Sequence, residues 1–249
     1  MAPVFDYALR LADTSLILGH RLSEWIGHAP LLEEELALGN IALDLIGEAR
    51  ELYTYAGKIE GKGRDEDALA YRRDAGEFRN ILLVEQPNGD FAHTIVRQFL
   101  FSAFAHPFWR GLAASRDVAL AAIAAKAEKE AAYHLRHASE WLIRLGDGTE
   151  ESQRRTQQAL EELWPYTGEM FETDAVERAL LTEEIAADIR PIRAEWETSV
   201  ADVLTEAALR LPVDAWMQGG GRSGRHSEHL GHLLATMQFL QRAYPGATW

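Results

Sequence analysis

The sequence predicts an all-α protein built from long helices. Apolar residues recur at helical spacing through most of the 249 residues, and turn signals rich in glycine and proline separate these stretches. The β-branched run at residues 81–84 has no visible partner strand, so we expect an extended or helical connector there. No linker or fixed-period repeat is evident. We therefore expect a single domain over residues 1–249, with a core bundle at about 4–145 and C-terminal helices at about 149–249.

A few residues mark where the helices begin, bend and end. Pro30 suits the first position of a helix, and Asp90 can cap the helix that follows it. Pro107 is expected to bend its helix, and Gly146 is expected to end the next one in a left-handed conformation. The predicted helices cover residues 4–26, 30–59, 66–73, 91–114, 117–145, 149–164, 174–180, 191–211 and 227–244.

The composition excludes several classes of protein. The chain carries 39 acidic against 25 basic residues, and its formal net charge of -14 repels nucleic acid and anionic lipid. No apolar run reaches the length of a membrane span, and the N-terminal residues lack the basic start and apolar core of a signal peptide. The absence of cysteine removes disulfides, thiolate metal ligands and cysteine nucleophiles. We expect a cytoplasmic protein that binds neither nucleic acid nor membranes.

The predicted helix at 117–145 carries an incomplete metal-binding signature. In ferritin-like four-helix bundles, a Glu-x-x-His pair places a carboxylate and an imidazole on one helical face to hold a di-iron centre. Here Tyr133 stands three residues after Glu130, and His134 follows one residue late. The similarity to this signature predicts a ferritin-like four-helix bundle with additional C-terminal helices.

Counting residues from the predicted turns identifies the positions that would face Glu130. A di-iron centre in such a bundle needs four carboxylates and two histidines, because hard iron ions are neutralised by oxygen anions and oriented by imidazole. The count gives two carboxylates and no histidine. The six positions hold Thr14, Asp44, Gly47, Phe101 or Ser102, Glu130 and Tyr133.

The shortage of ligands favours a remnant of a metal site over a working one. Asp44, Glu130 and His134, with Lys126 or Lys129, then form a buried polar cluster in which ion pairing replaces the metal charge. In the alternative interpretation, Asp44, Glu130 and His134 are the unusual ligand set of a di-metal oxygenase.

Other candidate groups are less specific. His226, His229 and His232 follow one another at three-residue steps, a spacing that matches no zinc signature and favours capping or interface roles. Arg222 and Arg225 lie in a glycine-rich loop directly before a helix, where an anionic group could dock, although a mobile linker with solvated arginines is an equal alternative. Glu24 and Glu48 are interpreted as ordinary helix-surface residues.

Five stretches carry a resemblance to a known family. They are residues 22–30 (LSEWIGHAP), 42–50 (ALDLIGEAR), 82–92 (LLVEQPNGDFA), 129–136 (KEAAYHLR), and the ending between residues 228 and 246. Together they resemble the structural C components of bacterial ring-1,2-phenylacetyl-CoA epoxidases, and the resemblance spans nearly the whole chain.

The resemblance implies a ferritin-like subunit of a multicomponent oxygenase in aerobic phenylacetate degradation. In that family, the catalytic A component carries the di-iron site, and the C component lacks a functional centre and pairs with A to stabilise it. A reductase with flavin and iron-sulfur groups supplies electrons from NADPH. This chain would then hold no cofactor, and its partners would be the A subunit and the other components. Arg222 and Arg225 become candidate contacts for CoA or for the A subunit.

Two alternatives to the scaffold role remain at this point. One is the di-metal oxygenase described above, which would hold metal and be active by itself. The other is a free-standing helical binding module, which would be a monomer without need of a partner.

Overall fold

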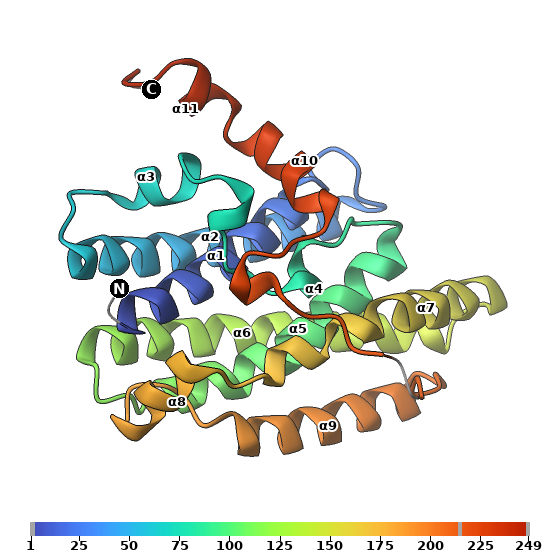
Figure 1. Cartoon of the computed structure of the whole chain (residues 1–249). Helices are drawn as coiled ribbons and strands as arrows, with labels where there is room; N and C mark the ends of the chain where they lie inside the picture. The colour runs from blue at the N-terminus through green and yellow to red at the C-terminus, as the bar shows by residue number, and fades with distance from the viewer. Residues whose placement is uncertain (1–2, 214–215, 248–249) are drawn as a thin grey trace. The chain divides into compact units, whose positions relative to one another are not determined.

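The structure is a computed structural model that describes residues 3–213 and 216–247 (Figure 1). Over these residues it contains α-helices, short 3-10 turns and connecting loops, and it contains no strand. The all-α prediction is thus confirmed. None of the described helices is long and apolar enough to cross a membrane.

The chain divides into two compact units, which are described separately. The first unit comprises residues 1–87 and 219–249, and the second comprises residues 88–218. The C-terminal segment therefore groups with the first helices of the chain, and the other helices that follow residue 145 group with the middle of the chain.

The first unit is organised around a helical hairpin. Helix α1 (Pro3–Ser23) packs along α2 (Leu32–Glu60). Residues 61–87, here called the connector, follow α2 and contain the short helices α3 (Glu66–Tyr71) and α4 (Leu82–Glu85). After the glycine loop, α10 (Glu228–Met237) and α11 (Phe239–Ala243) complete the unit. The β-branched run at residues 81–84 leads into the single turn of α4, so it is a helical connector, as expected.

The second unit is organised around a second pair of long helices. Helix α5 (Phe91–Leu112) packs against α6 (Val118–Gly146), and α7 (Glu150–Leu163) and α9 (Ile189–Glu206) also pack on α5. The short helix α8 (Ala175–Thr182) lies between α7 and α9 in the chain. Helix α5 continues through Pro107.

Side-chain caps fix where several helices begin. Asp90, Asp117 and Asp174 accept hydrogen bonds from backbone N–H groups of the first turns of α5, α6 and α8, and Thr149 does the same for α7. Each such cap contributes about 1 kcal/mol, because it satisfies a donor that has no partner within the helix. The predicted cap at Asp90 is confirmed.

Several predicted boundaries differ from the structure; the helix expected at residues 191–211, for example, is α9 at Ile189–Glu206. Three wrong boundaries are informative. Helix α2 begins at Leu32 instead of Pro30, and the carboxylate of Glu35 accepts a hydrogen bond from the Gly27 N–H of the preceding turn. Gly146 is helical and is followed by Asp147 as C-cap, so it is no left-handed cap. Glycine at this position allows another segment to pack closely on the helix, because a Cβ atom there would lie 2.2 Å from the carbonyl oxygen of Ala207.

The third wrong boundary concerns the last helix, which is broken at Gln238. The buried side chain of Gln238 donates hydrogen bonds to the carbonyl oxygens of Ala70 (3.1 Å) and Arg73 (3.0 Å). These bonds hold the junction of α10 and α11 against the connector of the first unit.

Candidate functional site

The residues of the predicted metal-site remnant belong to different units. Asp44 lies on α2 in the first unit and is half-buried, whereas Glu130, Tyr133 and His134 lie on α6 in the second. Each side of the predicted site can therefore be described by itself. The predicted cluster of Asp44 with the residues of α6 stays a prediction.

On α6 the three residues differ in exposure. Glu130 is half-buried, and its carboxylate lies 3.9 Å from the Lys126 ammonium one turn earlier. His134 is buried (4% exposed), whereas Tyr133 is exposed (39%). His134 lies nearer to Glu130 in angle around the helix axis than Tyr133 does, because positions i and i+4 share a helical face.

The donors on α6 do not fit half of a di-iron centre. That half should supply a carboxylate free to ligate and an imidazole three residues later, and here the carboxylate lies beside a lysine and the third position is an exposed phenol. Across residues 3–213 and 216–247, no group of three or more histidine or carboxylate side chains is arranged to hold a metal ion.

The first unit contains a buried charged cluster that sequence reasoning missed. The carboxylate of Asp13 on α1 is fully buried and accepts hydrogen bonds from the Tyr53 hydroxyl on α2 (2.5 Å) and the Arg79 backbone N–H (2.7 Å). The Arg73 guanidinium donates to both carboxylate oxygens, one of them at 3.0 Å. The Arg73 guanidinium also stacks on the Phe78 ring, 4.2 Å from its centroid.

The electrostatics of this cluster favour a neutral Tyr53 phenol and a charged Arg73 guanidinium. Burial and the adjacent Asp13 charge raise the pKa of the Tyr53 hydroxyl well above its usual value, so the phenol keeps its proton. Burial by itself lowers the pKa of Arg73, but the nearby Asp13 and Tyr53 together raise this pKa by more, so the net shift is upward. The Arg73 guanidinium therefore stays protonated, and its paired hydrogen bonds to the buried Asp13 carboxylate suit a structural role.

A second buried carboxylate belongs to Glu48 on α2. Its side chain is 5% exposed and accepts a hydrogen bond from the Ser15 hydroxyl on α1. The interpretation of Glu48 as a surface residue is therefore wrong, because the α1–α2 contact covers its position. Glu24 is exposed and pairs with Arg21 at 2.8 Å, as expected for a helix-surface residue.

A third buried carboxylate, Glu85, receives the C-terminal segment. One carboxylate oxygen lies 2.9 Å from the Asn80 amide nitrogen and 2.8 Å from Nδ1 of His226, and the other accepts the Ser227 N–H at 2.7 Å. The second ring nitrogen of His226 lies 3.0 Å from the Phe78 carbonyl oxygen. Both ring nitrogens thus face acceptors, so His226 is bound as an imidazolium.

The pKa of His226 agrees with this assignment. Burial lowers its pKa, but the hydrogen bonds to Glu85 and to the Phe78 carbonyl together raise this pKa by more, so the net shift is upward. Arg21 of α1 completes the arrangement, since its guanidinium donates to the Glu85 carbonyl (2.8 Å) and the His229 carbonyl (3.3 Å). We call Arg21, Glu85, His226 and Ser227 the C-terminal clamp.

The three histidines of the C-terminal segment therefore do not converge on one point. The His226 side chain binds Glu85, His229 contributes a backbone carbonyl to the clamp, and His232 lines a separate surface groove with His20. The capping role expected for His226 is wrong, because its ring binds Glu85 and the Phe78 carbonyl and the N-terminus of α10 has no side-chain cap.

The glycine loop is a compact turn. Gly220 and Gly224 have positive φ angles (123° and 81°), and the Arg225 N–H donates to the Gly220 carbonyl at 3.0 Å. A Cβ atom at Gly224 would lie 2.3 Å from the Gly76 carbonyl oxygen, so only glycine fits there. Arg222 is half-buried and Arg225 is exposed.

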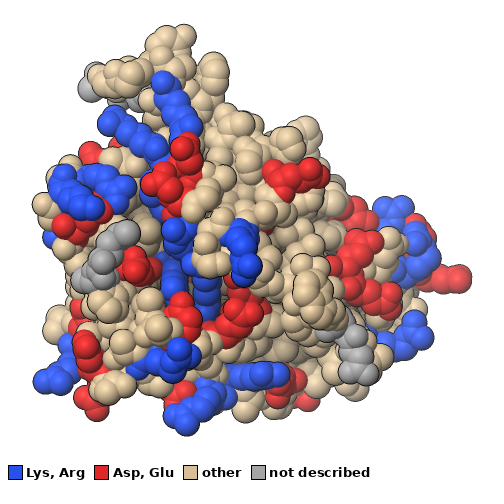
Figure 2. Space-filling view, viewed as in Figure 1, with Lys and Arg blue, Asp and Glu red and all other residues tan. Residues whose placement is uncertain are grey.

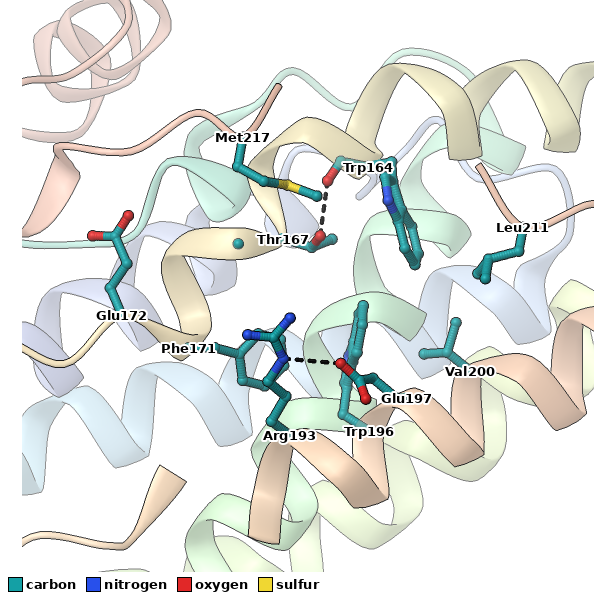
Figure 3. A pocket seen from close by; sticks show the side chains of 11 residues that line it. Trp164, Thr167, Phe171, Glu172, Arg193, Trp196, Glu197, Val200, Leu211 and Met217 are labelled. Atoms are coloured by element: carbon teal, nitrogen blue, oxygen red, sulfur yellow. Dashed lines mark hydrogen bonds and ion pairs between the residues drawn. The ribbon is translucent and has the colours of Figure 1, made fainter. Parts of the chain in front are cut away.

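The second unit contains an aromatic cavity (Figure 3). Its volume is about 590 Å³, and Trp164, Phe171, Trp196 and Met217 are among the residues that line it. The two indole rings lie 5.5 Å apart, and the Trp196 N–H donates to the Leu100 carbonyl at 3.0 Å. Polar groups also line the cavity, among them Thr167, Glu172 and an Arg193 guanidinium that donates to Glu197 at 2.9 Å.

Charges of both signs are mixed on the molecular surface. Lys and Arg side chains lie among Asp and Glu side chains on the face drawn in Figure 2. Several exposed arginines pair with nearby carboxylates, such as Arg190 with Asp188 at 2.7 Å. Such exposed pairs contribute little to stability, because water and salt screen their charges.

The sequence held a signal for part of what was missed. Asp13 lies on the same face of α1 as the apolar Leu9 and Leu16, and a carboxylate on an apolar face predicts a buried partner. The partners of Glu85 could not be found in this way, because His226 lies 141 residues further along the chain.

Together these features define a helical protein whose first unit contains buried charges that pair with each other. The chain belongs to the family described as phenylacetic acid catabolic protein, whose model matches residues 1–249. It is 51% identical over 243 residues to the C subunit of the 1,2-phenylacetyl-CoA epoxidase of Escherichia coli (strain K12), and the match covers 98% of each chain. The resemblance noted from the sequence is thereby confirmed.

Proposed function

We propose that the chain is the non-catalytic structural subunit of a multicomponent phenylacetyl-CoA 1,2-epoxidase in aerobic phenylacetate degradation. The observation that carries the proposal is the 51% identity, over 98% of both chains, to a protein named as the C subunit of this enzyme. A similarity that spans both chains makes a shared role as the same subunit the simplest interpretation.

In this role the chain pairs with the di-iron catalytic A subunit and stabilises it. The four longest helices, α1, α2, α5 and α6, form two packed pairs, in keeping with a ferritin-like four-helix bundle that carries additional C-terminal helices. The acidic, cysteine-free composition is in keeping with a cytoplasmic protein.

The absence of an active site in this chain is part of the proposal. On α6, Lys126 lies beside the Glu130 carboxylate, and the position of the expected histidine holds the exposed Tyr133. A cation supplied by the protein would substitute for metal charge there, with Asp44 and His134 as the other members of the remnant. The di-iron centre would reside in the A subunit, and the flavin and iron-sulfur groups in the reductase.

Arg222 and Arg225 are proposed as contacts for CoA phosphates or for the A subunit. The compact glycine turn places the half-buried Arg222 and the exposed Arg225 just before α10, and guanidinium groups bind phosphate by two parallel hydrogen bonds. Replacement of both by alanine is expected to weaken CoA binding or complex assembly by at least about tenfold. Unchanged values for both would remove these residues from the proposal.

Co-expression with the A subunit tests the proposed function. We expect the two chains to elute together in size-exclusion chromatography, with iron in the complex and less than stoichiometric metal in the isolated chain. Separate elution would contradict the scaffold role. Stoichiometric iron and epoxidation by the isolated chain would instead support the di-metal oxygenase.

A further inference from the structure

The outer face of α2 is apolar where a surface helix should be polar. The buried residues of this helix, among them Leu38, Ile41 and Leu45, lie on one side. The opposite side carries Leu32, Leu36 and Leu43, which are 69%, 60% and 67% exposed. These leucines recur at steps of four and seven residues, so they form one stripe along the helix axis.

Two glycines lie on the same stripe. A Cβ atom at Gly39 or Gly47 would meet no atom within 4 Å, so neither glycine is needed for packing inside the described chain. Glycine also costs about 0.5–1 kcal/mol relative to alanine inside a helix. A partner packed on the stripe would explain why glycine stands at these two positions.

Gly57, further along the same line of the helix, shows what such a glycine does. A Cβ atom there would lie 2.3 Å from the Arg64 carbonyl oxygen, so the chain itself packs its backbone directly on α2 at this point. From Leu32 to Gly47, the stripe alternates leucine with glycine, and its leucines are exposed. Small residues between large ones allow the backbone of another helix to approach closely.

The charges beside the stripe indicate what kind of helix covers it. Between residues 32 and 51, Glu34 and Glu48 are buried on the core side of α2, which leaves four of the six acidic residues and the single basic residue, Arg50, near the surface. Glu33 and Glu51 are exposed, and Glu35 and Asp44 are half-buried. Arg50 lies 3.4 Å from Glu66 of the same chain. The margins of the stripe are therefore negative.

This charge argues against a second copy of the chain as the occupant. Two α2 helices packed on each other would bring acidic margins together, and each copy carries a net charge of -14. A helix with apolar side chains in its centre and Lys or Arg along its margins would match both the shape and the charge.

We propose that the stripe of Leu32, Leu36, Gly39, Leu43 and Gly47, here called the α2 docking face, binds one apolar helix with basic margins from the catalytic partner subunit. The face is about 23 Å long at 1.5 Å per residue, enough for some four helical turns. Ile26 and Leu31, 60% and 53% exposed, add apolar surface in the turn before α2. The inference rests on the proposed function and names the surface by which the chain pairs.

Leu36→Asp with Leu43→Asp tests the face. Both side chains project into solvent, so circular dichroism and thermal unfolding should match those of the wild type. The affinity for the purified A subunit, measured by titration calorimetry, should fall by at least about tenfold, since hot-spot truncations cost this much or more. Val118→Asp is the matched control, because Val118 is 82% exposed on α6, outside the face.

Glu51→Lys tests the charge. The rate of association with the A subunit should fall, because a negative margin steers a basic partner. Added salt should also slow association less for the variant than for the wild type. Unchanged rates at low salt would contradict a basic partner helix.

Three results separate the two proposals. If the wild-type chain does not bind the A subunit, the proposed function fails and the docking inference falls with it. If the wild type and the double variant bind equally well, the docking face is wrong while the scaffold role stands. If the double variant instead dissolves a homodimer of the wild type, the occupant is a second copy and the inference is overturned.

Discussion

Replacing His226 by glutamine should loosen the contact between the C-terminal segment and the rest of the first unit. The His226 ring is 5% exposed and forms an ion pair with Glu85, whose side chain is fully buried. Removal of one partner of a buried ion pair costs about 3 kcal/mol, because the remaining charge stays buried without its counter-ion. Asn80 and the Ser227 N–H still bind Glu85, so the estimate lies at the lower end of the usual range.

Hydrogen exchange is the appropriate assay, since the change is local. A loss of about 3 kcal/mol corresponds to about a hundredfold faster exchange of the α10 amides, provided that they exchange by local opening of the clamp. His229→Gln is the control, because His229 contributes its backbone carbonyl to the clamp and keeps that group in the variant. Exchange in α6, in the other unit, should not change.

The effect should also depend on pH, and its sign follows from the raised pKa of His226. A group with a higher pKa in the folded state stabilises fully below its unfolded value, near 6.5, and loses this contribution as the pH rises through the folded value. The difference between the wild type and His226→Gln should therefore be largest at about pH 6 and shrink at higher pH. A difference that stays constant from pH 6 to pH 10 would refute the imidazolium assignment, and slow exchange in the variant would refute the clamp itself.

Two further substitutions test packing and charge inside the units. Asp13→Asn removes the anion of a fully buried ion pair and should lower the free energy of unfolding by about 3–5 kcal/mol in urea titrations, whereas Glu24→Gln, in an exposed pair, should change it by less than about 1 kcal/mol. Gly146→Ala forces a methyl group to within 2.2 Å of the Ala207 carbonyl oxygen and should destabilise by about 1–3 kcal/mol. Gly231→Ala in α10, where the added Cβ meets nothing within 4 Å, should be neutral or slightly stabilising, and equal effects at the two glycines would contradict the close approach.

The sequence was sufficient for features that are encoded locally. Helical periodicity, the Asp90 cap and the connector at residues 81–84 depend on neighbouring residues, and the structure agrees with all three. The break at Gln238 could not be predicted in this way, because its cause is a pair of hydrogen bonds to carbonyl groups more than 160 residues earlier. Gly146 was misread for a similar reason, since a glycine that ends a helix and one that admits another segment look the same in sequence.

The candidate site shows the same division. The incomplete signature around Glu130 was visible from spacing alone, and the family resemblance was visible from short motifs. Of the carboxylates buried in the first unit, Asp13 had a signal in its apolar helix face, whereas Glu48 and Glu85 resemble ordinary helix or loop carboxylates until their partners are known. Long-range pairing is a property of the fold.

The buried charges in the first unit share a geometric feature that bears on the scaffold role. The Asp13–Arg73 pair joins α1 to the connector, and the Glu85–His226 pair joins the connector to the C-terminal segment. Apolar side chains of similar volume could match such pairs in stability, but they would tolerate a shift of one segment along another, which a hydrogen-bonded ion pair does not. We infer that these pairs fix the register of segments distant in sequence. A subunit that acts through the shape of its surface depends on that register, and the α2 docking face lies on a helix that Tyr53 ties to the first of these pairs.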